Sequence, residues 1–280
     1  MKHGIVIGKF MPVHNGHLAL IDFAKRHCDE LIVSVSYTAE DSIDGTIRLG
    51  WLKSIFQNKP EIIIDKVVDD FDDESKPLEE RTKLWAQFIL KKYPPIDLVI
   101  SSEDYGEPFA KNLGARHLLF DPSRRQVPVS ATDIRTHPMQ NWDFIPDVVK
   151  PYFVKKVCFY GAESTGKSTM AKKMAAHYHT EYVPEVAREI ITSNDFTLDD
   201  IIAIGKAQAQ RVVEKSKLAN KVLFCDTDAI TTQIYSEQYL HRVPEILYQL
   251  EREITYDMYF LFEPDVPWVS DGLRDRKSVV

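Results

Sequence analysis

The segment between residues 8 and 17 gathers residue types that bind phosphate. Gly8–His17 reads GKFMPVHNGH and lies between an apolar strand pattern and a helical pattern that begins at Leu18. A glycine-containing turn from strand to helix brings backbone N–H groups to a helix N-terminus, where anions bind well. Lys9 adds a positive charge, and His14 and His17 add donors, so the segment is suited to stabilising charge on a phosphate. The alternative is that both histidines are ordinary polar residues around a turn.

A second phosphate-binding pattern follows the apolar run at 156–160. Gly161–Ser168 reads GAESTGKS, a complete Walker A sequence, and a helical pattern comes next. In such a loop the glycines let the backbone wrap around phosphates, the lysine reaches the terminal phosphates, and the serine hydroxyl can bind Mg²⁺. The sequence therefore predicts an ATP site. Its expected contacts are Gly161, Ser164, Thr165, Gly166, Lys167, Ser168 and Thr169.

Two acidic residues and one acidic run are candidates for metal binding or catalysis. Asp226 ends the apolar run at 222–225 and is a candidate Walker-B-like carboxylate that would hold Mg²⁺ together with Ser168. Glu185 follows the strand pattern at 181–183, where small-molecule P-loop kinases often keep substrate and base residues. A carboxylate that supports the dipole of a following helix is an equally open interpretation of Glu185. The acidic run Asp69–Glu74 is interpreted as a solvated loop.

Strand and helix patterns alternate throughout the chain. We expect strands at 4–7, 31–36, 62–64, 97–100, 117–120, 156–160, 181–183, 222–225 and 258–262, and helices at 47–56, after Pro77 and at 198–218. Strands separated by helices predict parallel sheets with covered faces, and hence a doubly wound α/β fold. Ligands of such sheets bind at the carboxyl ends of the strands, where the first motif falls. Pro138, Pro146 and Pro151 interrupt the pattern, which predicts domains at 1–150 and 151–280.

The first motif resembles the signature of the HxGH nucleotidyltransferases, in which this strand–turn–helix binds the triphosphate of ATP or CTP. Val129–Arg135, reading VSATDIR, is similar to the S-x-T-x-x-R motif of the same family. The resemblance implies that His14 and His17, supported by Lys9, act on the triphosphate and the transition state. It also implies a leaving pyrophosphate held with Mg²⁺. Further nucleotide contacts implied in this domain are Gly8, Phe10, Gly16, Ser130, Thr132 and Arg135.

A nucleotidyltransferase domain ahead of a P-loop kinase domain resembles the bifunctional NadR type. The segments PEVARE at 184–189, CDTD at 225–228 and EPDVPW at 263–268 are also similar to that family. The resemblance covers nearly the whole chain and implies NAD biosynthesis: adenylyl transfer from ATP to nicotinamide mononucleotide, and ATP-dependent phosphorylation of ribosylnicotinamide. It places Ser101–Glu107 near the nicotinamide nucleotide. Trp85 could stack on the nicotinamide ring or belong to the core.

Other functions stay open at this point. The first domain could serve another phosphorylated acceptor, although the Walker A domain behind it disfavours this. The chain could also be a nucleotide-sensing regulator coupled to nicotinamide riboside transport, which the paired histidines disfavour. The longest NadR-type proteins begin with a DNA-binding helix-turn-helix, whereas the first strand here starts at Gly4, so we expect no DNA partner. A homo-oligomer is possible.

The composition indicates which class of protein this is and in which cellular compartment it is expected. The 280-residue chain is 44% hydrophobic and 28% charged, with a net charge of −7, which is typical of a globular protein and disfavours general nucleic-acid or anionic-membrane binding. Cys28, Cys158 and Cys225 are far apart and are expected to be core residues in a reducing compartment. No signal peptide and no membrane-spanning run is visible, so a cytoplasmic location is expected.

The C-terminus departs from the family pattern. NadR-type kinases continue beyond Asp271–Arg274 with an arginine-bearing lid and a further strand, so the second domain is expected to be incomplete and weakly active as a kinase. The last residues, 275–280, read DRKSVV. A widely used sequencing adapter encodes these six residues before a stop codon, which suggests that the natural reading frame is longer.

Overall fold

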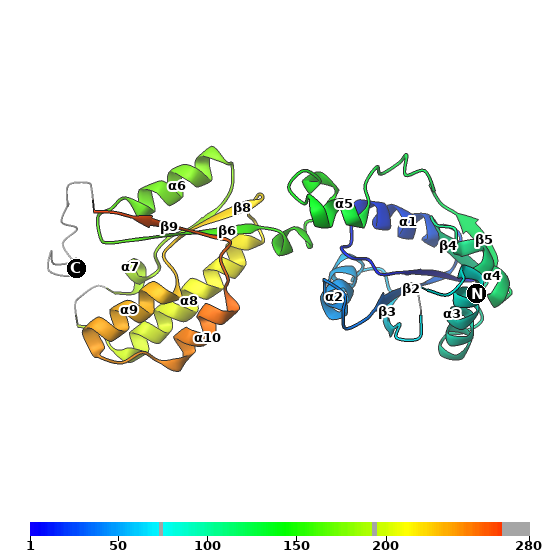
Figure 1. The fold of residues 1–280 in the computed structure, drawn as a ribbon, viewed down its shortest axis with the longest axis horizontal. Helices are drawn as coiled ribbons and strands as arrows, with labels where there is room; N and C mark the ends of the chain where they lie inside the picture. The colour runs from blue at the N-terminus through cyan, green and yellow to red at the C-terminus, as the bar shows by residue number, and fades with distance from the viewer. Residues whose placement is uncertain (73–74, 192–194, 265–280) are drawn as a thin grey trace. The chain divides into compact units, whose positions relative to one another are not determined.

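The structure is a computed structural model that describes residues 1–72, 75–191 and 195–264. The chain forms two compact units, Met1–Val149 and Lys150–Val280. Each unit has its own sheet of parallel strands (Figure 1). Within the described ranges, no helix combines the length and the apolar composition that crossing a bilayer requires.

The first unit alternates strands and helices. Its elements are β1 His3–Gly8, α1 Asn15–Lys25, β2 Glu30–Tyr37, α2 Gly45–Ile55, β3 Ile62–Val68, α3 Leu78–Lys92, β4 Leu98–Ser101, α4 Gly106–Leu113, β5 Arg116–Leu119, α5 Ala131–Thr136 and the 3-10 turn η1 Trp142–Phe144. The strands pair in the order β3-β2-β1-β4-β5, all parallel. The order reverses direction beside β1, as in doubly wound sheets, which confirms the predicted fold class.

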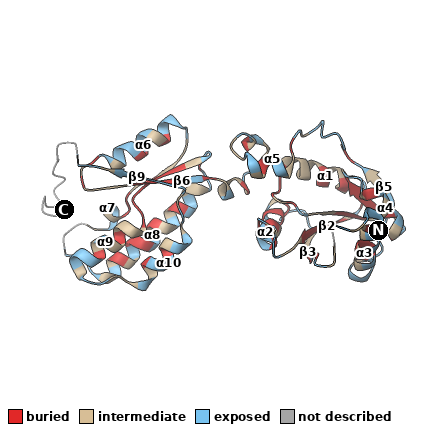
Figure 2. Cartoon of the chain, viewed as in Figure 1, coloured by how far each residue is buried: buried red, intermediate tan, exposed pale blue. Residues whose placement is uncertain are grey.

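Helices cover both faces of this sheet. On one face, Ile5, Ile32 and Val99 pack with Ile89 of α3 and Phe109 of α4 in one buried cluster. Figure 1 shows α1 on the opposite side of the sheet from α3. Because both faces are covered, the central strand β2 is buried along almost its whole length, and Figure 2 shows buried residues on the strands and on the helices that cover them. The fold thus leaves the carboxyl ends of the strands as the place for a ligand.

The second unit is also a parallel sheet covered by helices, with fewer described strands. Its elements are the 3-10 turn η2 Lys150–Tyr152, β6 Lys155–Gly161, α6 Lys167–His177, β7 Tyr182–Val183, α7 Ala187–Ile190, α8 Leu198–Ser216, β8 Val222–Asp226, α9 Ala229–Leu240, α10 Glu245–Glu253 and β9 Met258–Phe262. The described strands run in the order β7-β8-β6-β9 and are parallel. Helix α6 covers one face, and α8, α9 and α10 lie on the other (Figure 1).

Buried apolar contacts hold this second unit together. Phe159 and Phe224, from adjacent strands, pack against Ala171 and Ala175 of α6, whose small side chains let the helix lie close to the sheet. On the other side, Leu247 of α10 packs against Ile201 of α8. Cys28 of the first unit and Cys158 and Cys225 of the second are buried and free, which confirms their interpretation as core residues.

The structure differs from the predicted elements in several places. Strand β3 extends to Val68 rather than ending at residue 64, because its last residues pair with β2 as far as Tyr37. Helices α4, α9 and α10 were not predicted. Within the described residues β9 pairs only with β6, and its side chains are largely exposed. The expectations for residues 265–280 lie outside the described part of the chain.

Candidate functional site

The first motif forms the turn between β1 and α1. His14 is the N-cap residue of α1, and its Nδ1 accepts the Gly16 N–H at 3.1 Å. In return, Nδ1 of His17 accepts the His14 N–H at 3.3 Å. The two imidazoles therefore act as a reciprocal capping box. A Cβ at Gly16 would lie 2.9 Å from ring atoms of His14, so a side chain here would displace that ring.

These hydrogen bonds also set the protonation of both rings. Because Nδ1 of each ring accepts a backbone N–H, each neutral ring carries its proton on Nε2. Burial, with the charge of Arg124, lowers the pKa of His14 to about 4. Burial likewise lowers the pKa of His17 well below its usual value, and His14 and Arg124 add to the effect. Both residues are thus neutral Nε2–H donors at neutral pH, with their rings stacked 3.7 Å apart.

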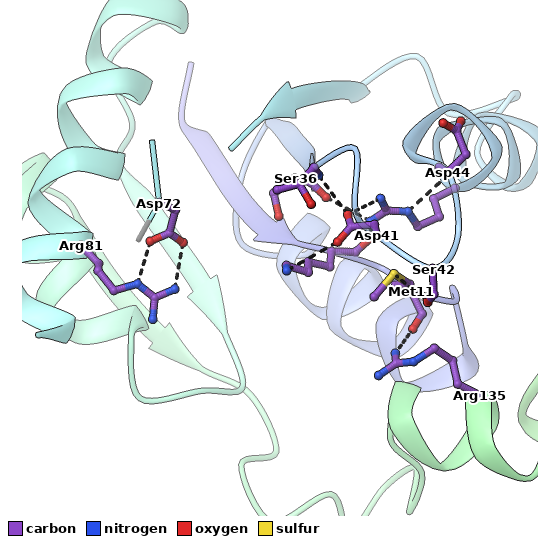
Figure 3. Close-up of polar contacts among 11 residues, drawn as sticks. Met11, Ser36, Asp41, Ser42, Asp44, Asp72, Arg81 and Arg135 are labelled. Atoms are coloured by element: carbon purple, nitrogen blue, oxygen red, sulfur yellow. Dashed lines mark hydrogen bonds and ion pairs between the residues drawn. The ribbon is translucent and has the colours of Figure 1, made fainter. Parts of the chain in front are cut away.

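A buried arginine holds the backbone of Lys9 in place. The Arg48 side chain, from α2, is fully buried and donates to the carbonyl oxygens of Lys9 and Ser36. Its guanidinium also pairs with the Asp41 carboxylate at 2.6 Å, and Asp41 lies 3.6 Å from the Lys9 ammonium (Figure 3). The buried charge is therefore compensated, as burial demands. The same network fixes both the backbone and the ammonium of Lys9. Phe10, also buried, packs its ring 4.9 Å from that of His17.

Helix α5 brings the second predicted motif to this turn. Arg135 donates to the carbonyl oxygen of Met11, which ties α5 to the first motif (Figure 3). The Ser130 hydroxyl caps α5 by accepting the Asp133 N–H at 3.0 Å, and it also donates to the Asp133 carboxylate at 2.6 Å. Thr132 accepts from Arg135 at 3.0 Å. Of the three residues that the motif singles out, Arg135 lines the cavity described next, whereas Ser130 and Thr132 do not.

A cavity of about 550 Å³ lies at the carboxyl ends of the strands of the first unit. Its wall includes Gly8, Lys9, Phe10, His14, Gly16, His17, Asp69, Asp72, Arg81, Trp85, Ser102, Glu103, Tyr105, Arg124 and Arg135. The strand order places the loop after β5, with Arg124, towards one edge of the sheet and the loop after β3, with Asp69, towards the other. The histidines, which follow the more central β1, lie between them. The cavity thus joins a cationic region to an acidic one.

Sequence reasoning missed Arg124 as a residue of this cavity and misjudged the burial of Asp69. Arg124 lies in the loop after β5 and acts electrostatically on both histidines; its only sequence signal was a basic pair after a predicted strand. Asp69 was assigned to a solvated loop, and this is wrong, because Asp69 is buried and lines the cavity. Trp85 belongs to the core cluster of α3 and also lines the cavity, so the two interpretations of it are compatible.

The Walker A segment forms the turn between β6 and α6. Gly161 and Gly166 have φ values of 142° and 90°, in a region that favours glycine. The Thr165 hydroxyl and the Lys167 ammonium donate to the Ala162 carbonyl oxygen at 2.8 and 2.7 Å, which closes the loop. Ser168 and Thr169 follow in the exposed first turn of α6, and Ser164 lies in the loop itself with a φ of 61°. Backbone N–H groups at this helix start suit a phosphate.

Asp226 fits a Mg²⁺ ligand. It ends β8, is 1% exposed, and neither of its carboxylate oxygens accepts a hydrogen bond of ordinary geometry from the described residues. Burial raises the pKa of this carboxyl, while the Ser168 hydroxyl nearby opposes the rise. A buried carboxylate without partners is costly unless a cation joins it. Mg²⁺ is commonly held by one or two carboxylates plus nucleotide phosphates, which matches Asp226 and Ser168 at the P-loop.

A second cavity, of about 210 Å³, lies in the same unit. Its wall includes Glu163, Glu185, Arg188, Gln208 and Tyr235. Glu185 is buried and pairs with Arg188 at 2.7 Å, just before α7. Asp228, two residues after Asp226, instead caps α9 by accepting the Ile230 and Thr231 N–H groups. The arrangement offers one carboxylate for a metal and others for an acceptor molecule.

Comparisons with known proteins agree with this two-site arrangement. Residues 5–47 match the cytidylyltransferase-like family, and residues 156–279 match a family described as an AAA domain. The trifunctional NAD biosynthesis/regulator protein NadR of Escherichia coli (strain K12) is 33% identical over 303 residues, covering 99% of this chain and 72% of that protein. The nicotinamide-nucleotide adenylyltransferase of Aeropyrum pernix is 28% identical over 140 residues, covering 48% of this chain and 78% of that enzyme.

A solved structure supports the fold over most of the chain. The crystal structure of a NadR protein in complex with NR superposes with a TM-score of 0.79 at 23% identity. The match covers 93% of this chain and 78% of that one. At this level of identity the likeness establishes the shared architecture, while the roles of individual side chains have to be argued from their geometry.

Proposed function

The chain belongs to the NadR family of NAD-biosynthesis proteins, and on that premise we propose that its first unit transfers the adenylyl group of ATP to nicotinamide mononucleotide. The products are NAD and pyrophosphate. A phosphate oxygen of the mononucleotide forms a bond to the α-phosphorus of ATP, while the bond from that phosphorus to the pyrophosphate oxygen breaks. The attacking phosphate is already anionic, so no general base is needed, and the protein's task is orientation and charge stabilisation.

The observation that carries this proposal is the pair of neutral imidazoles at the start of α1. Their Nδ1 atoms are engaged by the backbone, which leaves the Nε2–H groups of His14 and His17 as donors to phosphoryl oxygens. Neutral donors at the N-terminus of an eleven-residue helix stabilise negative charge as it develops. Lys9, Arg124 and Arg135 would neutralise the triphosphate and the departing pyrophosphate. Gly8, Phe10 and Gly16 shape the turn in which the phosphates lie.

For the second unit we propose transfer of the γ-phosphoryl group of ATP to the 5′-hydroxyl of ribosylnicotinamide. The hydroxyl oxygen attacks the γ-phosphorus, ADP leaves, and the hydroxyl proton passes to a carboxylate, for which Glu185 is the candidate beside the second cavity. Lys167 and the backbone of the P-loop would hold the phosphates. Mg²⁺, held by Ser168 and Asp226, would neutralise phosphate charge when bound. The product of this reaction is the acceptor of the first one.

The test is a product assay with each site disabled in turn. The unmodified chain is incubated with ATP and either nicotinamide mononucleotide or ribosylnicotinamide, and NAD, pyrophosphate and ADP are quantified. His17→Ala should abolish NAD formation from either substrate but leave the conversion of ribosylnicotinamide to the mononucleotide. Lys167→Ala should abolish the conversion of ribosylnicotinamide to the mononucleotide but leave NAD formation from added nicotinamide mononucleotide. Loss of both activities in either variant, with the fold intact, would contradict two independent sites.

A further inference from the structure

Two buried polar side chains hydrogen-bond to each other behind the wall of the first cavity. Ser101 ends β4 and is 1% exposed, and its Oγ lies 2.9 Å from Nε2 of His117, on the adjacent strand β5. The His117 side chain is itself only 8% exposed. Both residues reach the same face of the sheet, because Val99, two residues before Ser101, is the register partner of His117. Burying two polar groups is costly unless they pair with each other or with a neighbour.

This pair holds the beginning of the loop between β4 and α4, residues 102–105. The Ser101 hydroxyl donates to the Glu103 carbonyl oxygen at 3.1 Å, and the Gly106 N–H donates to the same oxygen at 3.2 Å. A His117 ring that carries a proton on Nε2 donates it to Ser101 Oγ, which leaves the single hydroxyl proton for Glu103. His117 then sets the direction of the Ser101 hydrogen bond, and that bond fixes the first turn of the loop.

The end of the loop is fitted to the same pair. Gly106 is the first residue of α4, and a Cβ there would collide with Ser101 Oγ and His117 Nε2. The start of the helix therefore packs directly on the hydrogen bond. Glu107, in the first turn of α4, places its carboxylate 3.2 Å from His117 Nδ1, but its side chain is 81% exposed, so solvent screens this contact. The buried hydrogen bond is the stronger constraint on the loop.

The loop that these residues hold is part of the cavity wall. Ser102, Glu103 and Tyr105 line the cavity. The Tyr105 hydroxyl donates to the Ile7 carbonyl oxygen at 2.7 Å, beside Gly8 of the first motif. The loop thus joins the end of β4 to the end of β1, and a shift of the loop would change the cavity next to the phosphate-binding turn.

A serine, a histidine and a glutamate within reach of one another can also make a nucleophile, but burial argues against that role here. Neither Ser101 nor His117 is among the residues that line the cavity, and Gly106 packs over the serine hydroxyl. A nucleophile has to reach the reacting atom of its substrate. Ser101 and His117 can therefore affect the reaction only through the loop that they hold.

We propose that Ser101 and His117 are positioning residues of the first unit, whose hydrogen bond keeps the 102–105 loop in the form that binds a nucleotide. The inference rests on the proposed adenylyl transfer, since it concerns substrate binding in that reaction. When only a fraction of the protein has the loop in place, the apparent affinity falls by that fraction. Neither side chain touches the reacting phosphorus, so the effect of losing the bond belongs to KM rather than to kcat.

The experiment compares three variants of the 280-residue chain by steady-state kinetics of NAD formation. His117→Leu removes both ring nitrogens and should raise KM for at least one of the two nucleotides by at least about fivefold, the effect of a buried hydroxyl that loses its partner. In this variant kcat should stay within about twofold of the unmodified value. His117→Gln, whose side-chain amide can again donate to Ser101 Oγ, should restore KM to within about twofold. His27→Leu makes the same change at an exposed histidine and should leave both KM values unaltered.

Two results would overturn the proposal. Unchanged KM values for both nucleotides in His117→Leu, whatever happens to kcat, would show that the hydrogen bond only supports the fold. An equal rise of KM in His117→Leu and His117→Gln would show that packing matters and the hydrogen bond does not. If His117→Leu does not fold, Ser101→Ala removes the hydroxyl instead, fits the same space and should raise the same KM.

A binding measurement separates this proposal from the adenylyl transfer on which it rests. If the unmodified chain forms no NAD, it is the proposed adenylyl transfer that fails. Titration calorimetry with ATP and with nicotinamide mononucleotide then compares the same variants, in a Lys167→Ala background that removes ATP binding at the P-loop. Weaker binding of either nucleotide in His117→Leu, recovered in His117→Gln, supports the positioning role, and equal affinities in all variants overturn it.

Discussion

The lowered pKa of His14 makes the stability of the first unit depend on pH in a predictable direction. In the native state His14 takes up a proton only near pH 4, whereas in the unfolded chain it does so near its ordinary value of 6.5. Between these values the unfolded state binds more protons at this residue, so acidification favours unfolding. The contribution to stability is fully present above pH 6.5 and is lost as the pH falls towards 4.

The perturbation that isolates this contribution is His14→Asn. Asparagine is a favourable N-cap residue and can still accept the Gly16 N–H, but it does not titrate. One pKa unit corresponds to about 1.36 kcal/mol, and between pH 7 and pH 5 only the unfolded histidine becomes charged. The free energy of unfolding of the unmodified chain should therefore fall by about 2 kcal/mol more than that of the variant over this interval.

Urea denaturation at pH 7, 6 and 5 provides the measurement, with tryptophan fluorescence as the probe. Of the four tryptophans in the sequence, Trp51, Trp85 and Trp142 are buried in the first unit, so the signal reports mainly on it. Identical pH dependence in the two proteins would refute the reasoning, because it would mean that His14 titrates alike in the native and unfolded states.

Three further predictions concern activity. His17→Ala should lower the rate of NAD formation by about 100-fold, as loss of one transition-state donor does, while His27→Ala, at an exposed histidine just after α1, should have little effect. Lys167→Ala should lower ADP formation with ribosylnicotinamide by at least about 100-fold and leave NAD formation from the mononucleotide within about twofold. Arg124→Ala should raise KM for ATP by about tenfold or more, the value of one charge-assisted hydrogen bond, whereas Arg125→Ala, outside the cavity wall, should not. Steady-state kinetics check all three, and a His17→Ala enzyme with unreduced turnover would remove the histidines from the mechanism.

Local patterns were sufficient for the framework of both units. Strand patterns in the sequence predicted all the strands that the structure describes, and for the central strands the reason is that a parallel strand with both faces covered must be apolar along most of its length. Their ends were less certain, as with β3, because strand length depends on pairing with β2. Helix α9 was not predicted, because its apolar residues show no clear helical face; its start is set by Asp228 as a cap.

The two phosphate-binding turns could be predicted from local sequence, because each lies within a single strand–turn–helix whose residues are neighbours in the chain. Gly8–His17 and Gly161–Ser168 could be located without any tertiary information. The residues that surround the first turn depend on how distant parts of the chain pack together. Asp69 and Arg124 belong to loops about sixty and one hundred residues away, and the parallel order β3-β2-β1-β4-β5 brings both to the same end of the sheet as the histidines. The burial of Asp69 and the place of Arg124 in the cavity wall follow from that packing, which no local pattern specifies.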